Sequence, residues 1–140
     1  MDSTADVTAT DSQCTLREAI ANADADSDTT GGDCAAGSGT DTISFDPSIF
    51  QGTITLSGTE LSINSDLFID GPNAGITVDG NATSRVFLVN SGTVTFNNLI
   101  ITNGNLAGAG TLVGGGIRNS GNLTINDSRI DSNSLFSTNF

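Results

Sequence analysis

The residues best suited to chemistry in this sequence are four aspartates in one polar stretch. Asp24, Asp26, Asp28 and Asp33 lie close together, and the first three follow the alternate spacing with which calcium-binding loops begin. The EF-hand pattern then fails, because the glycine and the glutamate that it requires are missing. Two interpretations remain, a calcium site formed by these carboxylates or a solvated acidic loop, and the sequence favours the second.

Cys14 and Cys34 are the other reactive side chains. The chain contains no histidine, and two thiolates alone do not complete the tetrahedral shell of a structural zinc ion. We therefore expect a disulfide between them, and the alternative is two unpaired thiols in a reducing compartment. A disulfide would indicate a secreted or cell-surface protein.

Residue types that commonly carry catalysis are missing from this chain. It has no histidine, lysine, tyrosine or tryptophan, so it lacks the usual general base at neutral pH. Arg118 and Arg129, with Asp127 and Asp131 near them in sequence, are residue types that carbohydrate-cleaving β-helices use, but surface ion pairs are the simpler interpretation. We expect no complete catalytic set here, and therefore no enzymatic activity of the chain itself.

The charge balance excludes further classes of partner. The chain contains sixteen acidic residues and four arginines, which gives a net charge of −12 at neutral pH. Such a surface repels the phosphates of nucleic acids and the headgroups of anionic lipids. No run of 18 apolar residues is present. We predict neither nucleic-acid binding nor membrane insertion.

The first secondary-structure element that would position these residues is a helix, predicted over residues 15–24. Its apolar positions recur at intervals of three and four residues, at Leu16, Ala19, Ile20 and Ala23. Thr15 and Glu18 have the spacing of a capping box, with Thr15 as the N-cap. Arg17 and Glu18 would form a solvated pair on the polar face. Residues 1–13 lack periodicity and could form an extended strand around Val7.

From Ile43 onward, short β-prone triplets alternate with turns rich in glycine, asparagine, aspartate and serine. Residues 91–98 recur at 120–127, an offset of 29, which also places Asn90 on Asn119 and Ile101 on Ile130. A looser copy runs over residues 61–71, at an offset of 32 to 33 from residues 94–104.

Strands this short favour a solenoid, because stacking successive coils about 4.8 Å apart buries their inward residues and completes the backbone ladder. An antiparallel sandwich is the competing fold. In the solenoid, Asn97 would stack on Asn126. The face of Phe87 relative to Leu88 is left open. The predicted inward residues are Ile54, Leu56, Ile63, Ile69, Val78, Val94, Phe96, Ile101, Leu123 and Ile125.

The heptad Cys14-Thr15-Leu16-Arg17-Glu18-Ala19-Ile20 resembles the Cys-Ser-Leu-Arg-Glu-Ala motif of the CSLREA domain, and threonine for serine keeps the capping hydroxyl. That domain lies at the N-terminus of large bacterial surface proteins with parallel β-helix bodies. Residues 69–72, 99–104 and 114–121 resemble the coils that follow it, and also the repeats of polymorphic outer-membrane proteins. The resemblance covers essentially the whole chain and implies a location at the bacterial cell surface.

Together these observations predict an all-β fold, a right-handed parallel β-helix with an N-terminal α-helical cap. Residues 1–42 would form the cap, with the helix, the acidic loop and the tether from Cys14 to Cys34, and residues 43–140 would form coils of the same single domain. A cap is needed because an open solenoid end exposes apolar side chains and unpaired strand edges. The C-terminal end shows no comparable cap, so we expect that the natural protein continues or that this end meets a partner.

The leading functional hypothesis is a non-enzymatic extracellular β-helix module, that is, a stalk, adhesion or assembly unit of a secreted or cell-surface protein. Its ligand would be a carbohydrate or another cell-surface group, and no cofactor is expected unless calcium binds. One alternative is the N-terminal part of a carbohydrate-active, pectin-lyase-like enzyme whose site lies in coils beyond residue 140. Another is a filament subunit that self-associates through the uncapped C-terminal end.

Overall fold

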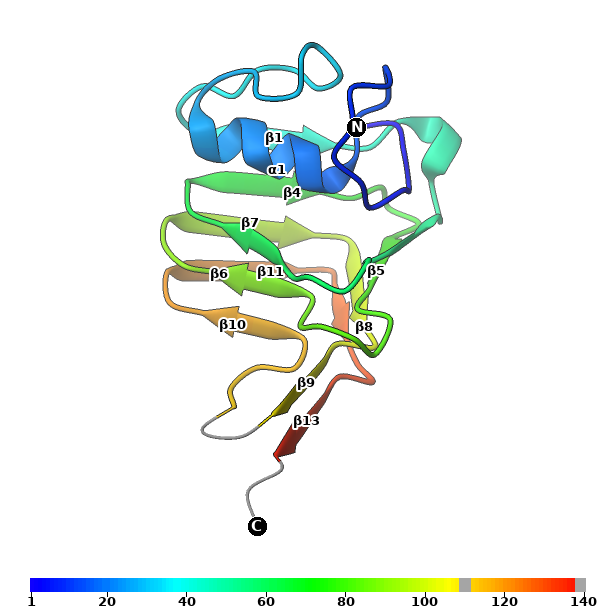
Figure 1. The fold of residues 1–140 in the computed structure, drawn as a ribbon, viewed down its shortest axis with the longest axis vertical. Coiled ribbons are helices and arrows are strands. Elements are labelled where there is room, and N and C mark those ends of the chain that lie inside the picture. Colours follow the sequence, from blue (N-terminus) through cyan, green and yellow to red (C-terminus); the bar gives the residue numbers. More distant parts are fainter. Residues whose placement is uncertain (109–111, 138–140) are drawn as a thin grey trace.

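A computed structural model describes residues 1–108 and 112–137 (Figure 1). Over these residues the chain forms a β-solenoid of about three turns, with mostly parallel sheets and one short α-helix. The first elements are α1 (Leu16–Ala25), β1 (Asp41–Ser44), the 3-10 turn η1 (Pro47–Ile49), β2 (Thr53–Thr55), β3 (Leu61–Ile63), β4 (Leu67–Asp70) and β5 (Ile76–Asp79). They are followed by β6 (Phe87–Val89), β7 (Thr93–Asn97), β8 (Leu99–Thr102), β9 (Asn105–Gly108), β10 (Ile117–Asn119), β11 (Asn122–Asn126), β12 (Arg129–Ile130) and β13 (Ser134–Ser137).

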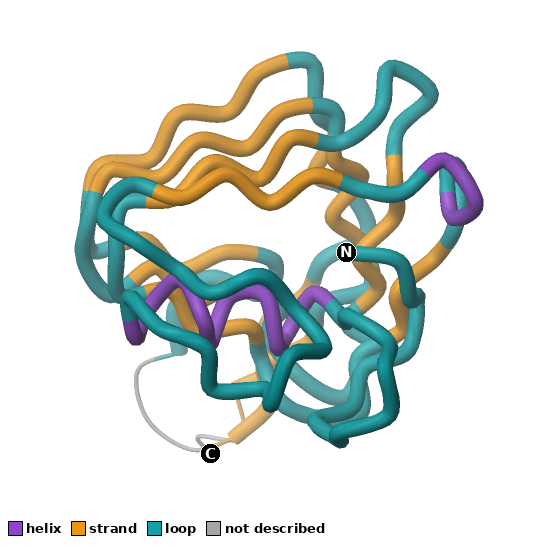
Figure 2. Tube along the Cα trace, turned by 90° about the horizontal axis from the view of Figure 1, so that it is seen from above, coloured by secondary structure: helices purple, strands orange, loops and turns teal. Residues whose placement is uncertain are grey.

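The strands of successive turns stack into parallel sheets. In the described residues the sheet orders are β1-β4-β7-β11, β2-β5-β8-β12, β3-β6-β10 and β9-β13. The chain visits the first three sheets in turn and returns to the first one rung further along, which Figure 2 shows as strands lying over one another. The solenoid is therefore confirmed, and the antiparallel sandwich is excluded.

The interior of the solenoid is a column of aliphatic side chains that includes two phenylalanine rings in tilted contact. Eight of the ten predicted inward residues, from Ile54 to Ile101, are fully buried. Phe87 also points inward, with its ring centroid 4.7 Å from that of Phe96, whereas Leu88 is half-buried on the outer face. The prediction of burial is wrong for Ile125, which is 37% exposed. Ile125 pairs with Phe96 in register, so it points inward, but β11 is the last strand of its sheet and no described strand covers it.

The structure confirms the repeat offset of 29 for two strand pairs, and it shows that two other predicted alignments are wrong. The offset of 29 holds where β11 pairs with β7 and where Ile130 pairs with Ile101. Asn119, however, pairs with Val89 rather than with Asn90, because the turn after β10 is one residue shorter than the turn after β6. The looser copy is also displaced, since β3 and β4 pair with β6 and β7 at offsets of 26 and 27.

A row of polar side chains runs along the outer edge of the β4-β7-β11 sheet. Asn126 Nδ2 donates to Asn97 Oδ1 at 2.9 Å, as the repeat predicted, and Asn97 Nδ2 donates to Asp70 Oδ1 at 3.3 Å. The residues that follow, Asn98 and Asp127, have φ of 55° and 47°. Asparagine and aspartate tolerate this left-handed conformation best among residues with a side chain, so the same residue types both mark the turns and tie them together.

The helix α1 lies at the N-terminal end of the solenoid, where it packs against β1 and β3 (Figures 1 and 2). Leu16, Ile20 and Ala23 are buried and belong to the same core as the solenoid interior. Residues 1–13 form no strand, and Val7 is exposed, so the predicted strand around Val7 is wrong.

We expect Phe96→Ala to lower the free energy of unfolding by about 3–5 kcal/mol, because it removes a fully buried ring. Ile125→Ala, at the register-equivalent position one turn later, should cost below about 1 kcal/mol because no strand covers that side chain. Urea denaturation of both variants measures the difference. Equal losses would contradict the assigned register.

Candidate functional site

The N-terminus of α1 is held by a capping box. Thr15 is the N-cap, its hydroxyl accepts from the backbone N–H of Glu18, and Glu18 Oε2 accepts from the N–H of Thr15 at 3.0 Å. Glu18 is 3% exposed, and its Oε1 accepts from the N–H of Ala9 at 2.8 Å. The capping box is confirmed, but the solvated position expected for Glu18 is wrong, because this carboxylate fastens residues 1–13 to the helix.

Arg17 is likewise not a solvated side chain. Its Nε and Nη2 donate to the two carboxylate oxygens of Asp6 at 2.7 and 2.9 Å, and its guanidinium also donates to the backbone oxygens of Thr59 and Glu60. The Asp6 side chain is 2% exposed and accepts two further hydrogen bonds from Ser57. Burial raises the pKa of Asp6, but the hydrogen bonds from Arg17 and Ser57 outweigh it, so the pKa lies below its usual value.

A second arginine, Arg85, is buried and continues this arrangement along the solenoid. Arg85 donates to Glu60 Oε2 at 2.6 Å and to the backbone oxygens of Gly114 and Val113 at 2.8 and 3.0 Å. Since Arg17 also binds the backbone of Glu60, contacts run without interruption from α1 to the turn before β10. We call Asp6, Arg17, Glu60 and Arg85 the arginine network. Sequence analysis missed Arg85, because no motif or periodicity distinguishes it from the other arginines.

Cys14 and Cys34 form a disulfide with a Cα–Cα distance of 4.9 Å, as predicted, and both are buried. The bridge joins the residue before the N-cap to the loop that follows α1. Asn22, which sequence analysis missed, is also buried and organises the same loop. Its Nδ2 donates to the backbone oxygens of Cys34 and Ala35, and its Oδ1 accepts from the N–H of Thr29.

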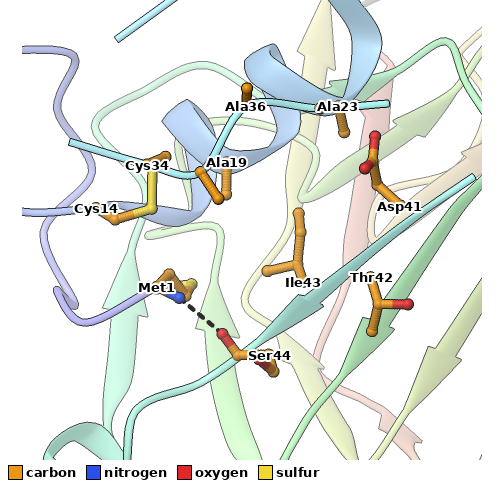
Figure 3. A pocket seen from close by; sticks show the side chains of 12 residues that line it. Met1, Cys14, Ala19, Ala23, Cys34, Ala36, Asp41, Thr42, Ile43 and Ser44 are labelled. Carbon is orange, nitrogen blue, oxygen red and sulfur yellow. Dashed lines mark hydrogen bonds between the residues drawn. A yellow bond between two sulfur atoms is a disulfide. The ribbon is translucent and has the colours of Figure 1, made fainter. Parts of the chain in front are cut away.

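A small cavity of about 180 Å³ lies between α1, β1 and the disulfide (Figure 3). Its walls are mostly small and apolar, including Ala19, Ala23 and Ile43. The amine of Met1 donates to the backbone oxygen of Ser44 at 2.7 Å, and Asp41 is the one carboxylate among the described lining residues. The described lining holds no histidine, and both of its cysteines are in the disulfide, so it presents few of the groups that commonly carry acid–base catalysis.

The four aspartates of the acidic loop do not converge. Within residues 1–108 and 112–137, no three histidine, cysteine, aspartate or glutamate side chains are grouped to hold a metal ion. Each carboxylate instead accepts hydrogen bonds from backbone N–H groups in a different part of the chain. Asp24 accepts from Asn64 and Asp26 accepts from Gly39. Asp28 accepts from Thr30, and Asp33 accepts from Asp11 and Ser12. The hydrogen bonds from Thr30 lower the pKa of Asp28. These carboxylates therefore act as acceptors for turns, and the structure does not bring the candidate calcium ligands together.

The arginines near the C-terminus are not brought together either. Arg118 is on β10 and Arg129 is on β12, which belong to different sheets and so to different faces of the solenoid. Arg129 forms an exposed ion pair with Asp131 at 3.2 Å. For Arg129 this matches the interpretation as a surface ion pair, which contributes little to stability.

Comparison of the chain with family models, with curated proteins and with solved structures finds no match. No helix in the described part of the chain is long and apolar enough to cross a membrane.

Asp6→Asn should destabilise the protein by about 1.5–3 kcal/mol at pH 7, because Arg17 loses a charged acceptor. The folded-state pKa of Asp6 is depressed, so its stabilising contribution is present above the unfolded-state value near 3.9 and is lost as pH falls through the folded-state pKa. The gap between wild type and Asp6→Asn in urea midpoints should thus close below pH 4. Asp131→Asn, in an exposed pair, is the control; a gap independent of pH would contradict the assignment.

Replacing both cysteines by serine should lower the free energy of unfolding by about 3 kcal/mol, the value expected for opening a loop of this size. Calorimetric melting of the double variant, compared with wild type in the presence and absence of reductant, measures this. A reductant-insensitive melting temperature in wild type would show that the bridge does not form in solution.

Proposed function

We propose that this chain is the capped N-terminal end of a right-handed parallel β-helix, and that it serves as a non-enzymatic stalk, adhesion or assembly unit of a secreted or bacterial cell-surface protein. The observation that carries the proposal is the position of α1. The apolar face of α1 lies in the core next to β3. Because β3 is the first strand of the β3-β6-β10 sheet, the helix takes the place of a further strand.

The six residues of the motif from Thr15 to Ile20 support a cap rather than a catalytic site. Thr15 and Glu18 form the capping box, Leu16 and Ile20 enter the core, and Ala19 packs against it. Arg17 binds Asp6 and the loop before β3. Since every side chain of the motif has a structural partner, its resemblance to the CSLREA domain is best explained by the need to close a solenoid end.

A buried disulfide and an acidic surface support an extracellular location. The bridge between Cys14 and Cys34 would not persist among cytosolic reductants in most organisms. The net charge of −12 favours solubility and disfavours contact with nucleic acids. A ligand, if one binds, would be a carbohydrate or another surface group.

The non-enzymatic assignment is supported by the use of the charged side chains. The arginine network and the loop aspartates are engaged in fixing turns and in fastening the N-terminal segment. Incubation with acidic and neutral polysaccharides, followed by measurement of new reducing ends, tests this assignment. Cleavage by this chain would contradict the non-enzymatic assignment.

Ile20→Asp should destabilise the protein by at least about 3 kcal/mol, because it buries an unpaired carboxylate against the first turn. Amide hydrogen exchange should accelerate most in β1 and β3, next to α1, and least in β13. Ala21→Asp, on the exposed face of the same helix, is the matched control and should leave both readouts unchanged. Uniform acceleration in both variants would contradict a capping role.

A further inference from the structure

We propose that a groove on the side of the solenoid, next to the turn between β4 and β5, binds a neutral oligosaccharide. The inference rests on the proposed role as a cell-surface adhesion unit, and it names the ligand class and the site. We call this recess the side groove. Its walls come from residues 73–75, 98–100 and 127–129. Its volume of about 460 Å³ is within the range of small-ligand sites.

The side groove exists because the turns between the first and second sheets differ in length. Asn98 alone joins β7 to β8, and two residues join β11 to β12, whereas residues 71–75 join β4 to β5. The longer turn reaches the outer face of β8, since a Cβ atom on Gly75 would lie 3.5 Å from Cδ1 of Ile100. This turn therefore forms one wall of the side groove, and the shorter turns leave the space beside it open.

Hydrogen bonds fix the turn over residues 71–75. The N–H of Gly71 donates to the backbone oxygen of Asn97 at 2.9 Å, and the N–H of Gly75 donates to that of Pro72 at 2.7 Å. Asn98 Nδ2 donates to the backbone oxygen of Gly71 at 3.1 Å. A wall that is already ordered loses little conformational entropy when a ligand binds.

Ile100 supplies an apolar surface in the side groove. Its chain neighbours Leu99 and Ile101 are fully buried, so the alternation along β8 points Ile100 outward. In register it lies between Thr77 on β5 and Arg129 on β12. An outward aliphatic side chain among polar neighbours offers a contact for the C–H face of a sugar ring, because that contact removes apolar surface from water.

The polar side chains of the side groove combine hydrogen-bond donors and acceptors. Asn73 and Asp127 are exposed, and the Arg129 side chain is 66% exposed. A guanidinium only donates, a carboxylate only accepts, and an amide does both. A sugar hydroxyl also donates and accepts, so a ligand with several hydroxyl groups can satisfy all three side chains.

The charges at the side groove favour an uncharged ligand. Arg129 already pairs with Asp131, at 3.2 Å, and Asp127 is close to it in sequence. An anionic sugar would meet these two carboxylates on a chain of net charge −12, whereas a cationic sugar would meet Arg129. A neutral oligosaccharide avoids both costs.

The side groove opens sideways rather than along the solenoid axis. Its walls come from equivalent positions of three successive turns, and Figure 1 shows β5 and β8 of two such turns stacked on each other. A further coil would stack beyond β12 and lengthen the side groove without covering it.

The first test is a titration followed by amide NMR, since the chain has no tryptophan or tyrosine to report binding by fluorescence. The neutral probes are cellotetraose, xylotetraose, mannotetraose and a tetramer of N-acetylglucosamine, and tetragalacturonate is the charged comparison. We expect at least one neutral probe to bind with a Kd on the order of 1 mM and to shift the amides of residues 73–75, 98–100 and 127–129. Tetragalacturonate should bind more weakly because its carboxylates are repelled.

The second test compares variants. Ile100→Thr gives β8 the residue type that β5 has at the paired position, and Arg129→Ala removes the guanidinium. Each should weaken binding about tenfold and leave circular dichroism unchanged. Arg118→Ala is the matched control, because it removes an exposed arginine from β10 in a different sheet and should not change binding.

The side groove would be overturned if no neutral probe shifts these amides at about 10 mM, well above the expected Kd. Largest shifts elsewhere, tighter binding of tetragalacturonate, or equal losses in Arg129→Ala and Arg118→Ala would also overturn it. None of these outcomes changes the capping role of α1, which hydrogen exchange tests separately. Binding in the side groove with release of new reducing ends would support the site and overturn the non-enzymatic assignment.

Discussion

The structure depends on one constraint: strands of two to five residues cannot satisfy their backbone or bury their side chains unless strands lie on both sides of them. Stacking in parallel register meets this need in the middle of the solenoid, where Val94 and Phe96 are fully buried between neighbouring turns. The same constraint makes the two ends of the stack the places where this protein has to differ from a regular repeat. Most of its non-repetitive residues are found at the N-terminal end.

At that end, α1 packs against β1 and β3 and is fastened by polar contacts. The apolar face of α1 supplies the core with side chains, while Arg17 and Glu18 reach back to residues 1–13 and forward to the loop before β3. Arg85 extends these contacts to the third turn. Buried charged groups are stabilising only when their hydrogen bonds are satisfied, and Asp6 and Arg85, the two almost fully buried members of the arginine network, meet that condition.

The acidic residues have a structural role as hydrogen-bond acceptors in turns. Asp24, Asp28 and Asp46, among others, accept hydrogen bonds from backbone N–H groups in turns, where the ladder leaves those donors unpaired. Solenoids of short strands have many turns, so they need many such acceptors. The high negative charge follows from this use of aspartate, and its concentration in the first 79 residues gives the solenoid one repulsive end and one neutral end.

The sequence by itself determined the elements that rest on local chemistry and on period. The capping box of Thr15 and Glu18, the bridge between the two cysteines, the stacked parallel strands and eight inward residues were all predicted, because side-chain spacing and burial encode them directly. Two strands, β9 and β13, were not indicated, since residues such as those of β9 have low strand propensity and pair only because a neighbouring turn presents an edge. Register across turns was also decided by tertiary structure, because a difference of one residue in a turn shifts Asn119 onto Val89. The partners of Asp6, Arg17 and Arg85 were decided in the same way, since they join segments up to 51 residues apart that only the coiling of the chain brings together.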